Sequence, residues 1–257
     1  MRCAVVQRSL LVVALVGVVG GSRPGLGAVA QEGTPAVAAG AALPPDASVA
    51  GLSLAEWSAR SWQWFFSFPQ QVNAFSDETG ARCGYGQFGP VFFLAGAERS
   101  VERACVVPAG VHLLVPLLGS ECSTVEPPPF FGRDETELRH CATEAVDTAE
   151  AAQDMATMRV AVDGQSVGDL SAHRTVTPRF PLWLPEANLL GSSQQVADSV
   201  ADGYLVLLSP LAEGEQVVTI TVPGPQPGET ITITYRLTIV SGAFATPSAA
   251  PEASPTG

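Results

Sequence analysis

The strongest periodic pattern in the chain is an alternation of apolar and polar residues over positions 230–240. Every second residue from Ile231 to Ile239 is large and apolar, so these side chains share one face of an extended strand. Many of the residues are β-branched, and such a strand would promote aggregation if it lay at an open edge. The pattern therefore predicts a central strand.

A helical period replaces this alternation near residue 60. Ser53 and Glu56 form a capping-box pair, large residues then recur at spacings of three and four, and Pro69 ends the pattern. Trp62 and Phe66 lie off the main apolar stripe. Because the helix is apolar on more than one side, we expect it to pack against a sheet.

Shorter apolar or alternating segments bounded by Pro and Gly predict the other strands. They cover residues 89–95, 100–107, 111–118, 158–162, 166–170, 180–184, 204–208 and 216–222. Residues 96–99 are expected to join the first two strands in a hairpin, and Asp163-Gly164 predicts another hairpin between 158–162 and 166–170. A second helix is expected from the capping pair Asp134 and Glu137 to about residue 154.

These elements predict a mainly β fold with two inserted helices, arranged as a β-sandwich with a jelly roll as one form of it. The single β-rich domain is expected to span residues 51–242. Residues 31–50 are rich in Ala, Pro, Gly and Val without any period, which predicts a flexible stalk. Residues 243–257 predict a disordered tail.

The first thirty residues have the pattern of a secretory signal peptide. Arg2 and Arg8 precede an apolar run over residues 9–20, and Ala28-Val-Ala30 supplies small residues before a cleavage site between Ala30 and Gln31. The run is shorter than the roughly 20 residues that cross a bilayer, so a retained anchor is the less favoured alternative. We expect an exported protein, outside the cell or at its envelope, with no stable membrane span after cleavage.

The charge of the chain argues against nucleic acid as a partner. The full chain has a net charge of −12, and removing residues 1–30 takes away three arginines and no acid, which gives −15. An acidic surface repels nucleic acid and anionic lipid.

Four cysteines remain after the predicted cleavage: Cys83, Cys105, Cys122 and Cys141. An even number of cysteines in an exported chain predicts two disulfides, for which three pairings are possible. Pairing each cysteine with its neighbour in sequence is preferred, because the first two flank the predicted hairpin. Each bridge would then close a loop of about 20 residues, which stabilises a fold by about 3 kcal/mol.

Motifs for cofactors and metals lack the context that they need. Residues 84–89 match G-x-G-x-x-G, but Pro90 and a strand follow where a nucleotide site requires a helix. The histidines have no metal-ligand spacing, so a site would need the fold to bring them to a carboxylate such as Glu121 or Asp169. They are His112, His140 and His173. The sequence therefore predicts no cofactor and no metal.

Acidic and aromatic residues leave two further possibilities. The acidic residues near Asp134 suit a helix N-terminus, where negative charge is favourable. Residues Glu98 to Arg103 alternate in charge, as on a hairpin surface. A pair of carboxylates for glycoside hydrolysis nevertheless remains an alternative. The aromatic residues of the first helix are expected in the core instead of on a sugar-binding surface. They are Trp57, Trp62, Trp64, Phe65 and Phe66. Trp183 is the better candidate for an exposed aromatic side chain.

Three stretches of the chain share a recognisable pattern: Trp62-Gln-Trp64, Cys83-Gly-Tyr-Gly-Gln87-Phe-Gly-Pro-Val-Phe-Phe-Leu-Ala-Gly96 and Arg103-Ala-Cys105-Val-Val-Pro108-Ala-Gly110. They resemble a group of uncharacterised exported bacterial proteins, which have a Trp-rich helix, a Cys-x3-Gln-x-Gly-Pro-Val-x-Phe-Leu-Ala-Gly strand and a Cys-x-Val-Pro-Ala-Gly turn. The resemblance implies an exported bacterial β-domain and supplies no catalytic residue. In members of the group, a Lys often follows the Pro-Ala-Gly turn and a His often follows a Gly-Glu pair. In this chain these two positions are Val111 and Gln216.

The sequence thus favours a non-enzymatic, disulfide-braced domain that binds an unidentified ligand or envelope component. A secreted hydrolase with a carboxylate-based site and a purely structural envelope protein are the alternatives.

Overall fold

The computed structural model describes residues 38–226 and 228–242. Several expectations fall outside these residues: the signal peptide over 1–30, its cleavage between Ala30 and Gln31, the first part of the stalk, and the tail over 243–257.

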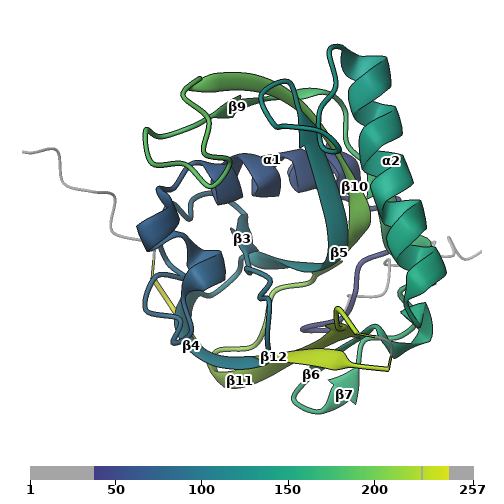
Figure 1. Cartoon of the computed structure of the whole chain (residues 1–257). Coiled ribbons are helices and arrows are strands. Elements are labelled where there is room, and N and C mark those ends of the chain that lie inside the picture. Colours follow the sequence, from purple (N-terminus) through teal and green to yellow (C-terminus); the bar gives the residue numbers. More distant parts are fainter. Residues whose placement is uncertain (1–37, 227, 243–257) are drawn as a thin grey trace, which may run out of the picture. The chain divides into compact units, whose positions relative to one another are not determined.

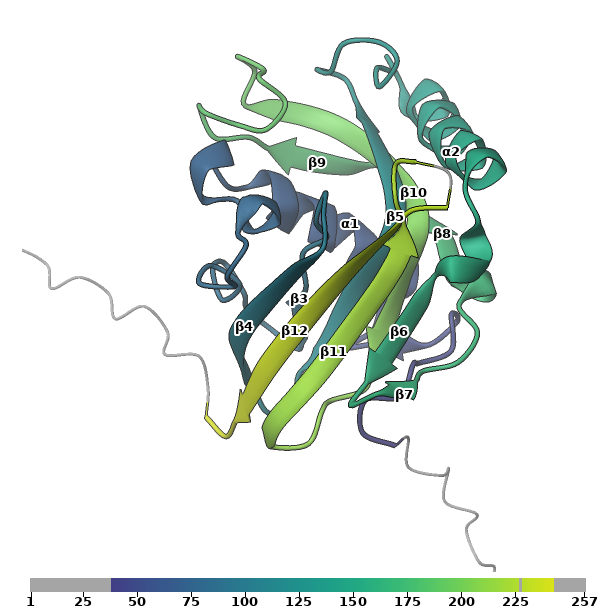
Figure 2. The same ribbon diagram turned by 60° about the horizontal axis from the view of Figure 1, so that its bottom comes forward.

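The described residues form two α-helices and two five-stranded sheets (Figures 1 and 2). The helices are α1 (Leu54–Phe66) and α2 (Glu135–Ala152). Sheet 1 has the order β3 (Val91–Phe93), β5 (His112–Ser123), β10 (Val196–Leu208) and β8 (Arg174–Val176), and β9 (Phe180–Trp183) also pairs with β10. Sheet 2 has the order β4 (Val101–Pro108), β12 (Thr230–Val240), β11 (Gly214–Pro223), β6 (Arg159–Val162) and β7 (Gln165–Ser166). Smaller elements are β1 (Ser48–Val49), β2 (Leu52–Ser53) and 3-10 turns at Gln70–Val72, Ala74–Ser76, Met155–Thr157 and Ser171–His173.

This architecture confirms the mainly β class with two helices and the sandwich-like arrangement of the sheets. The jelly roll is not confirmed, because β3 pairs with β5 and β4 pairs with β12 in parallel. Among the described residues, no helix has the length and apolar character needed to cross a membrane.

The alternation of side chains along β10 organises the layers. Val206 belongs to the core between the two sheets, whereas Leu205 and Leu207 point to the other face and pack beneath α1. Nearer the start of the strand, Val200 packs against Leu138 of α2. Sheet 1 therefore has α1 on one face and sheet 2 together with α2 on the other (Figure 1).

The predicted central strand is confirmed. β12 spans the expected residues and lies between β4 and β11 in sheet 2. Its alternate apolar side chains, from Ile231 to Ile239, are all buried in the core between the sheets.

The first helix is confirmed with its capping box. Ser53 Oγ accepts a hydrogen bond from the Glu56 backbone N–H, and the Glu56 carboxylate accepts one from the Ser53 N–H at 2.8 Å. One side of α1 packs on sheet 1 through Trp57 and Trp64, and another side packs on β9 through Phe66. The second helix begins after its predicted cap, Asp134, and α2 ends two residues before the expected end.

The expected hairpin between residues 89 and 107 is wrong. β3 and β4 lie in different sheets, so the chain crosses between the sheets instead of turning back. The Tyr235 hydroxyl holds this crossing, because it accepts from the Ala95 N–H at 3.0 Å and donates to the Ala95 carbonyl at 2.7 Å. The second hairpin is confirmed: β6 and β7 pair through Asp163 and Gly164, which both adopt the positive φ that this turn requires.

Within residues 38–50, the described part of the predicted stalk, the chain is hydrogen-bonded to the end of β10. The Leu43 N–H donates to the Leu207 carbonyl at 2.8 Å, and the Ser209 N–H donates to the Ala41 carbonyl at 2.9 Å. Backbone hydrogen bonds at the edge of β10 do not depend on side-chain type, so composition alone could not predict them.

The structure contains two disulfides, Cys83–Cys105 and Cys122–Cys141, each with a Cα–Cα distance of 6.1 Å. This is the preferred pairing of neighbours in sequence. The first bridge ties the segment before β3 to β4, and the second ties β5 to α2.

Candidate functional site

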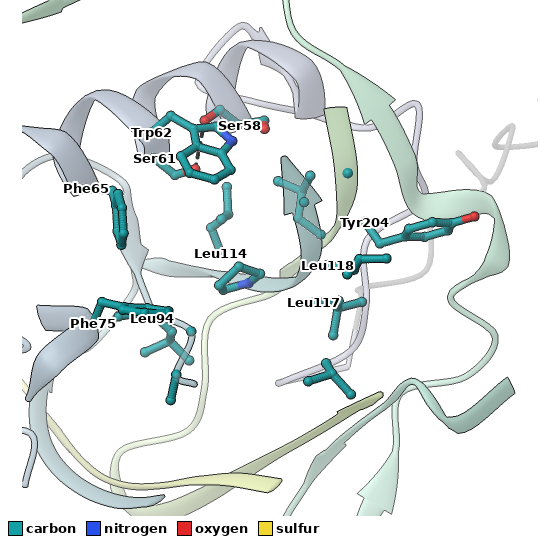
Figure 3. A pocket seen from close by; sticks show the side chains of 18 of the residues that line it. Ser58, Ser61, Trp62, Phe65, Phe75, Leu94, Leu114, Leu117, Leu118 and Tyr204 are labelled. Atoms are coloured by element: carbon teal, nitrogen blue, oxygen red, sulfur yellow. Dashed lines mark hydrogen bonds between the residues drawn. The ribbon is translucent and has the colours of Figure 1, made fainter. Parts of the chain in front are cut away.

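A cavity of about 370 Å³ lies beside β5, where the short strand β3 ends (Figure 3). β3 pairs with β5 only from His112 to Leu114, so β5 has no partner on this edge at Pro116. Because proline has no backbone N–H, Pro116 leaves no backbone donor unpaired at this open edge. The walls come from α1, Phe75, the segment after β3, strands β5 and β10, the end of β11 and the first half of β12.

Most of the cavity wall is apolar. Trp62 and Phe65 of α1 form its upper side in Figure 3, and Phe75 faces Phe65 with their ring centroids 5.7 Å apart. Leu118 of β5 and Ile231 of β12 line other sides. A volume of this size lies at the lower end of the roughly 300–1,000 Å³ range of ligand pockets, which are mostly apolar with few polar groups.

A pair of glycines keeps space open below Trp62. Gly119 and Gly203 are direct cross-strand partners. A Cβ atom on Gly203 would lie 2.4 Å from the Leu118 carbonyl oxygen, so the close approach of the strands requires glycine here. A Cβ atom on Gly119 would lie 3.5 Å from the Trp62 ring. The cavity therefore exists partly because neither strand has a side chain at this point.

The one charged side chain among the described lining residues is neutralised. Asp202 is 2% exposed, and its carboxylate accepts two hydrogen bonds from Arg174, at 2.6 and 3.1 Å. Arg174 also contacts Glu150 and Asp147 of α2, and these acids together with Asp202 raise the pKa of the guanidinium. The Tyr204 hydroxyl donates to Glu150, and in Figure 3 it points away from the cavity. The cavity thus presents an essentially uncharged wall.

Arg103 fixes two walls from behind, although the sequence placed it on a hairpin surface. It is 2% exposed and donates to the backbone carbonyls of Phe75, Asp77, Ala95 and Gly96. It also donates to the Tyr235 hydroxyl at 2.7 Å, and it forms no ion pair with a described carboxylate. The arginine therefore acts as a hydrogen-bond hub that joins the segment of Phe75 to the end of β3.

Gln87, from the motif that carries the resemblance, supports β3 in a similar way. Its side-chain amide donates to the Cys83 and Phe93 carbonyls at 3.0 and 2.8 Å, and its oxygen accepts from the Phe93 N–H at 3.0 Å. The Gln87 side chain thus makes the backbone hydrogen bonds that a neighbouring strand would otherwise make at the outer edge of β3.

The aromatic residues of α1 divide into two groups. Trp57, Trp64 and Phe66 are buried, as expected for core residues, whereas Trp62 and Phe65 are half-buried. Trp62, Trp64 and Phe65 line the cavity. Trp183 is 60% exposed beside its cross-strand partner Val196, which confirms it as an exposed aromatic residue.

The other candidate residues lie apart from the cavity. His140 lies on α2 with its Nε2 3.5 Å from Glu144, His173 is buried with its Nε2 3.2 Å from the Leu43 carbonyl, and His112 begins β5. Burial lowers the pKa of His112. The described residues contain no group of His, Cys, Asp and Glu side chains that could hold a metal ion. The G-x-G-x-x-G residues form a loop before β3, with no helix after it.

Glu121 and Glu126 form a carboxyl pair outside the cavity. Their side chains share a hydrogen bond, Ser199 donates to Glu121, and Ser123 donates to Glu126 at 2.9 Å. Burial raises the pKa of both groups, that of Glu121 well above its ordinary value. Glycoside hydrolysis needs two carboxyl groups about 5–9.5 Å apart around a substrate, which differs from this hydrogen-bonded pair. Asp169, the other carboxylate considered, binds the Ser171 hydroxyl and N–H.

Several residues of the site carry no functional motif in the sequence. Ser58, Phe75 and the glycines of β5 and β10 come from separate segments, and the one local signal is a glycine inside each otherwise regular strand.

No known protein family, curated protein or solved structure matches the chain.

Proposed function

We propose that the protein is an exported, non-enzymatic domain that binds a small, uncharged apolar molecule in the cavity beside β5. The cavity carries this proposal: it is large enough for a small ligand, its walls are mostly apolar, and its one carboxylate is paired with Arg174. A polypeptide ligand is disfavoured, because a strand added at the open edge of β5 would need a backbone donor that Pro116 lacks.

Three observations support export. The pattern of residues 1–30 is typical of a signal peptide, the four cysteines that follow it form two disulfides, and the chain resembles exported bacterial proteins. The ligand would then be met outside the cell or at its envelope.

The geometry gives less support to the alternatives. A carboxylate-based hydrolase needs two free carboxyl groups facing a pocket, and the described lining offers Asp202, which Arg174 already binds. A purely structural role would leave the cavity without a ligand, so a binding experiment separates it from the proposed function.

The test uses N-phenyl-1-naphthylamine, an uncharged dye that fluoresces in apolar surroundings. Ser61→Phe would fill the cavity, because Ser61 lines it. Ser67→Phe is the matched control: both hydroxyls donate to the carbonyl three residues earlier, at 2.7 and 2.8 Å, but Ser67 is exposed and outside the lining.

We expect saturable binding of the dye to the native protein, at least tenfold weaker binding to Ser61→Phe and unchanged binding to Ser67→Phe. Circular dichroism of each variant checks that it is folded. The proposal would be overturned if the dye showed no saturable binding to the native protein. Equal affinity of the dye for the folded Ser61→Phe variant and for the native protein would also overturn it.

A further inference from the structure

Two hydrogen-bond donors of α1 lack partners at the cavity wall. The indole N–H groups of Trp57 and Trp64 donate to the carbonyls of Val49 and Tyr85, at 3.0 and 2.9 Å. Trp62, the third tryptophan of the helix, has no such partner among the described residues. Ser58 is 4% exposed, and its hydroxyl likewise bonds to no described residue.

The two donors lie on the same side of α1. Ser58 and Trp62 are four residues apart, which places them one turn apart on one helix face, and both line the cavity (Figure 3). In the indole ring of Trp62, Cζ2 lies on the same edge as Nε1. A Cβ atom added to Gly119 would lie 3.5 Å from this Cζ2 atom. The donor edge of the indole therefore faces the space that the glycine pair leaves open.

We infer that the ligand is an uncharged apolar molecule with one hydrogen-bond-accepting oxygen, such as a ketone or ester, which accepts from Trp62 and Ser58. The inference rests on the proposed function and specifies its ligand. Both side chains line the apolar cavity, so a ligand oxygen there would accept hydrogen bonds that no described residue takes. A carboxylate ligand is disfavoured, because no cationic side chain lines the described cavity to pair with it.

Three probes of nearly equal shape test this inference. 2-Acetylnaphthalene carries a carbonyl oxygen, 2-isopropenylnaphthalene carries a CH2 group in its place, and 2-naphthoate carries a carboxylate. Their affinities are measured by displacement of N-phenyl-1-naphthylamine from the native protein, from Ser58→Ala and from Trp62→Phe. Ser67→Ala and Trp183→Phe serve as controls, because both residues are exposed and lie outside the cavity lining.

We expect the ketone to bind at least about tenfold more tightly than the alkene, because only the ketone can accept hydrogen bonds from Ser58 and Trp62. Ser58→Ala and Trp62→Phe should reduce this ratio, whereas the controls should keep it. Because the ratio compares two ligands on the same protein, a change in stability does not alter it.

Equal binding of ketone and alkene to the native protein would overturn the inference and leave the proposed function intact. Tightest binding of 2-naphthoate would overturn it in favour of an anionic ligand. If neither the dye nor any of the three probes binds, the proposed function fails together with the inference.

Discussion

Tyr235 shows how one hydroxyl group can join two sheets. It lies on β12 of sheet 2, contacts both backbone groups of Ala95 after β3 of sheet 1, and accepts from Arg103. The sequence predicted its burial, because it lies on the apolar face of an alternating strand. It could not predict the partners, since these lie more than 130 residues away.

Tyr235→Phe should lower the free energy of unfolding by about 1–3 kcal/mol, because buried donors of Ala95 and Arg103 lose an acceptor. Urea unfolding measures the change. Tyr85→Phe is the control, since Tyr85 is half exposed and its hydroxyl has no partner among the described residues; it should change stability by less than about 0.5 kcal/mol. Equal effects of the two substitutions would contradict the role given to Tyr235.

The carboxyl pair of Glu121 and Glu126 should make stability depend on pH. Burial, followed by the charge of Glu126, raises the pKa of Glu121 well above its ordinary value, so the folded protein prefers the protonated form. This contribution to stability is complete at pH values below the ordinary pKa and is lost as the pH rises through the raised pKa of the folded state.

Glu121→Gln removes this titration while keeping the shape of a neutral acid. Its free energy of unfolding should therefore decrease less between about pH 4 and pH 8 than that of the native protein. Glu98→Gln, at an exposed position, should keep the native slope. An unchanged slope in Glu121→Gln would argue against a shared proton in this pair.

At the scale of elements, local pattern predicted where strands and helices form better than how they pair. Residues 89–95 form a continuous apolar run, and β3 is indeed buried on both faces, with Phe92 in the core between the sheets and Phe93 beneath α1. A strand of this type suits parallel pairing inside a protein. The short connection to β4 instead suggested a hairpin, because nothing in residues 96–99 indicates a crossing between sheets.

The helix α2 offers a test of the second disulfide. Cys122→Ser combined with Cys141→Ser opens a loop of 19 residues, which should lower the free energy of unfolding by about 3 kcal/mol. Hydrogen exchange should increase most in α2, which would then depend on its core contacts and on the ion pairs of Arg174. An unchanged melting curve would contradict a structural role for this bridge.

At the scale of the whole molecule, the cavity could not be predicted from the sequence. Its lining comes from α1, the segment after β3, the middle of β5 and β10, and the β11–β12 pair. Each segment reads locally as core, and only the premature end of β3 and the glycine pair leave space between them. The function proposed here therefore depends on the assembled fold.

The proposed export makes a prediction for the first residue of the mature protein. Mass spectrometry of the exported protein should show Gln31 as the first residue, and alkylation without reduction should modify no cysteine, since Cys3 would have been removed. A protein that begins at Met1 would contradict cleavage, and four reactive thiols would contradict the disulfides.

The position of β12 also has a consequence for when the protein can fold. β12 is the last strand, yet it lies between β4 and β11, and its pairing joins Val101 to Ile233. Until residues 230–240 have been synthesised, β4 has no neighbour in sheet 2, and the core between the sheets lacks one of its walls. Contacts between such distant residues form slowly. Sheet 2 and the core between the sheets are therefore completed only once this last strand is available, so the full fold forms after synthesis of the domain has ended.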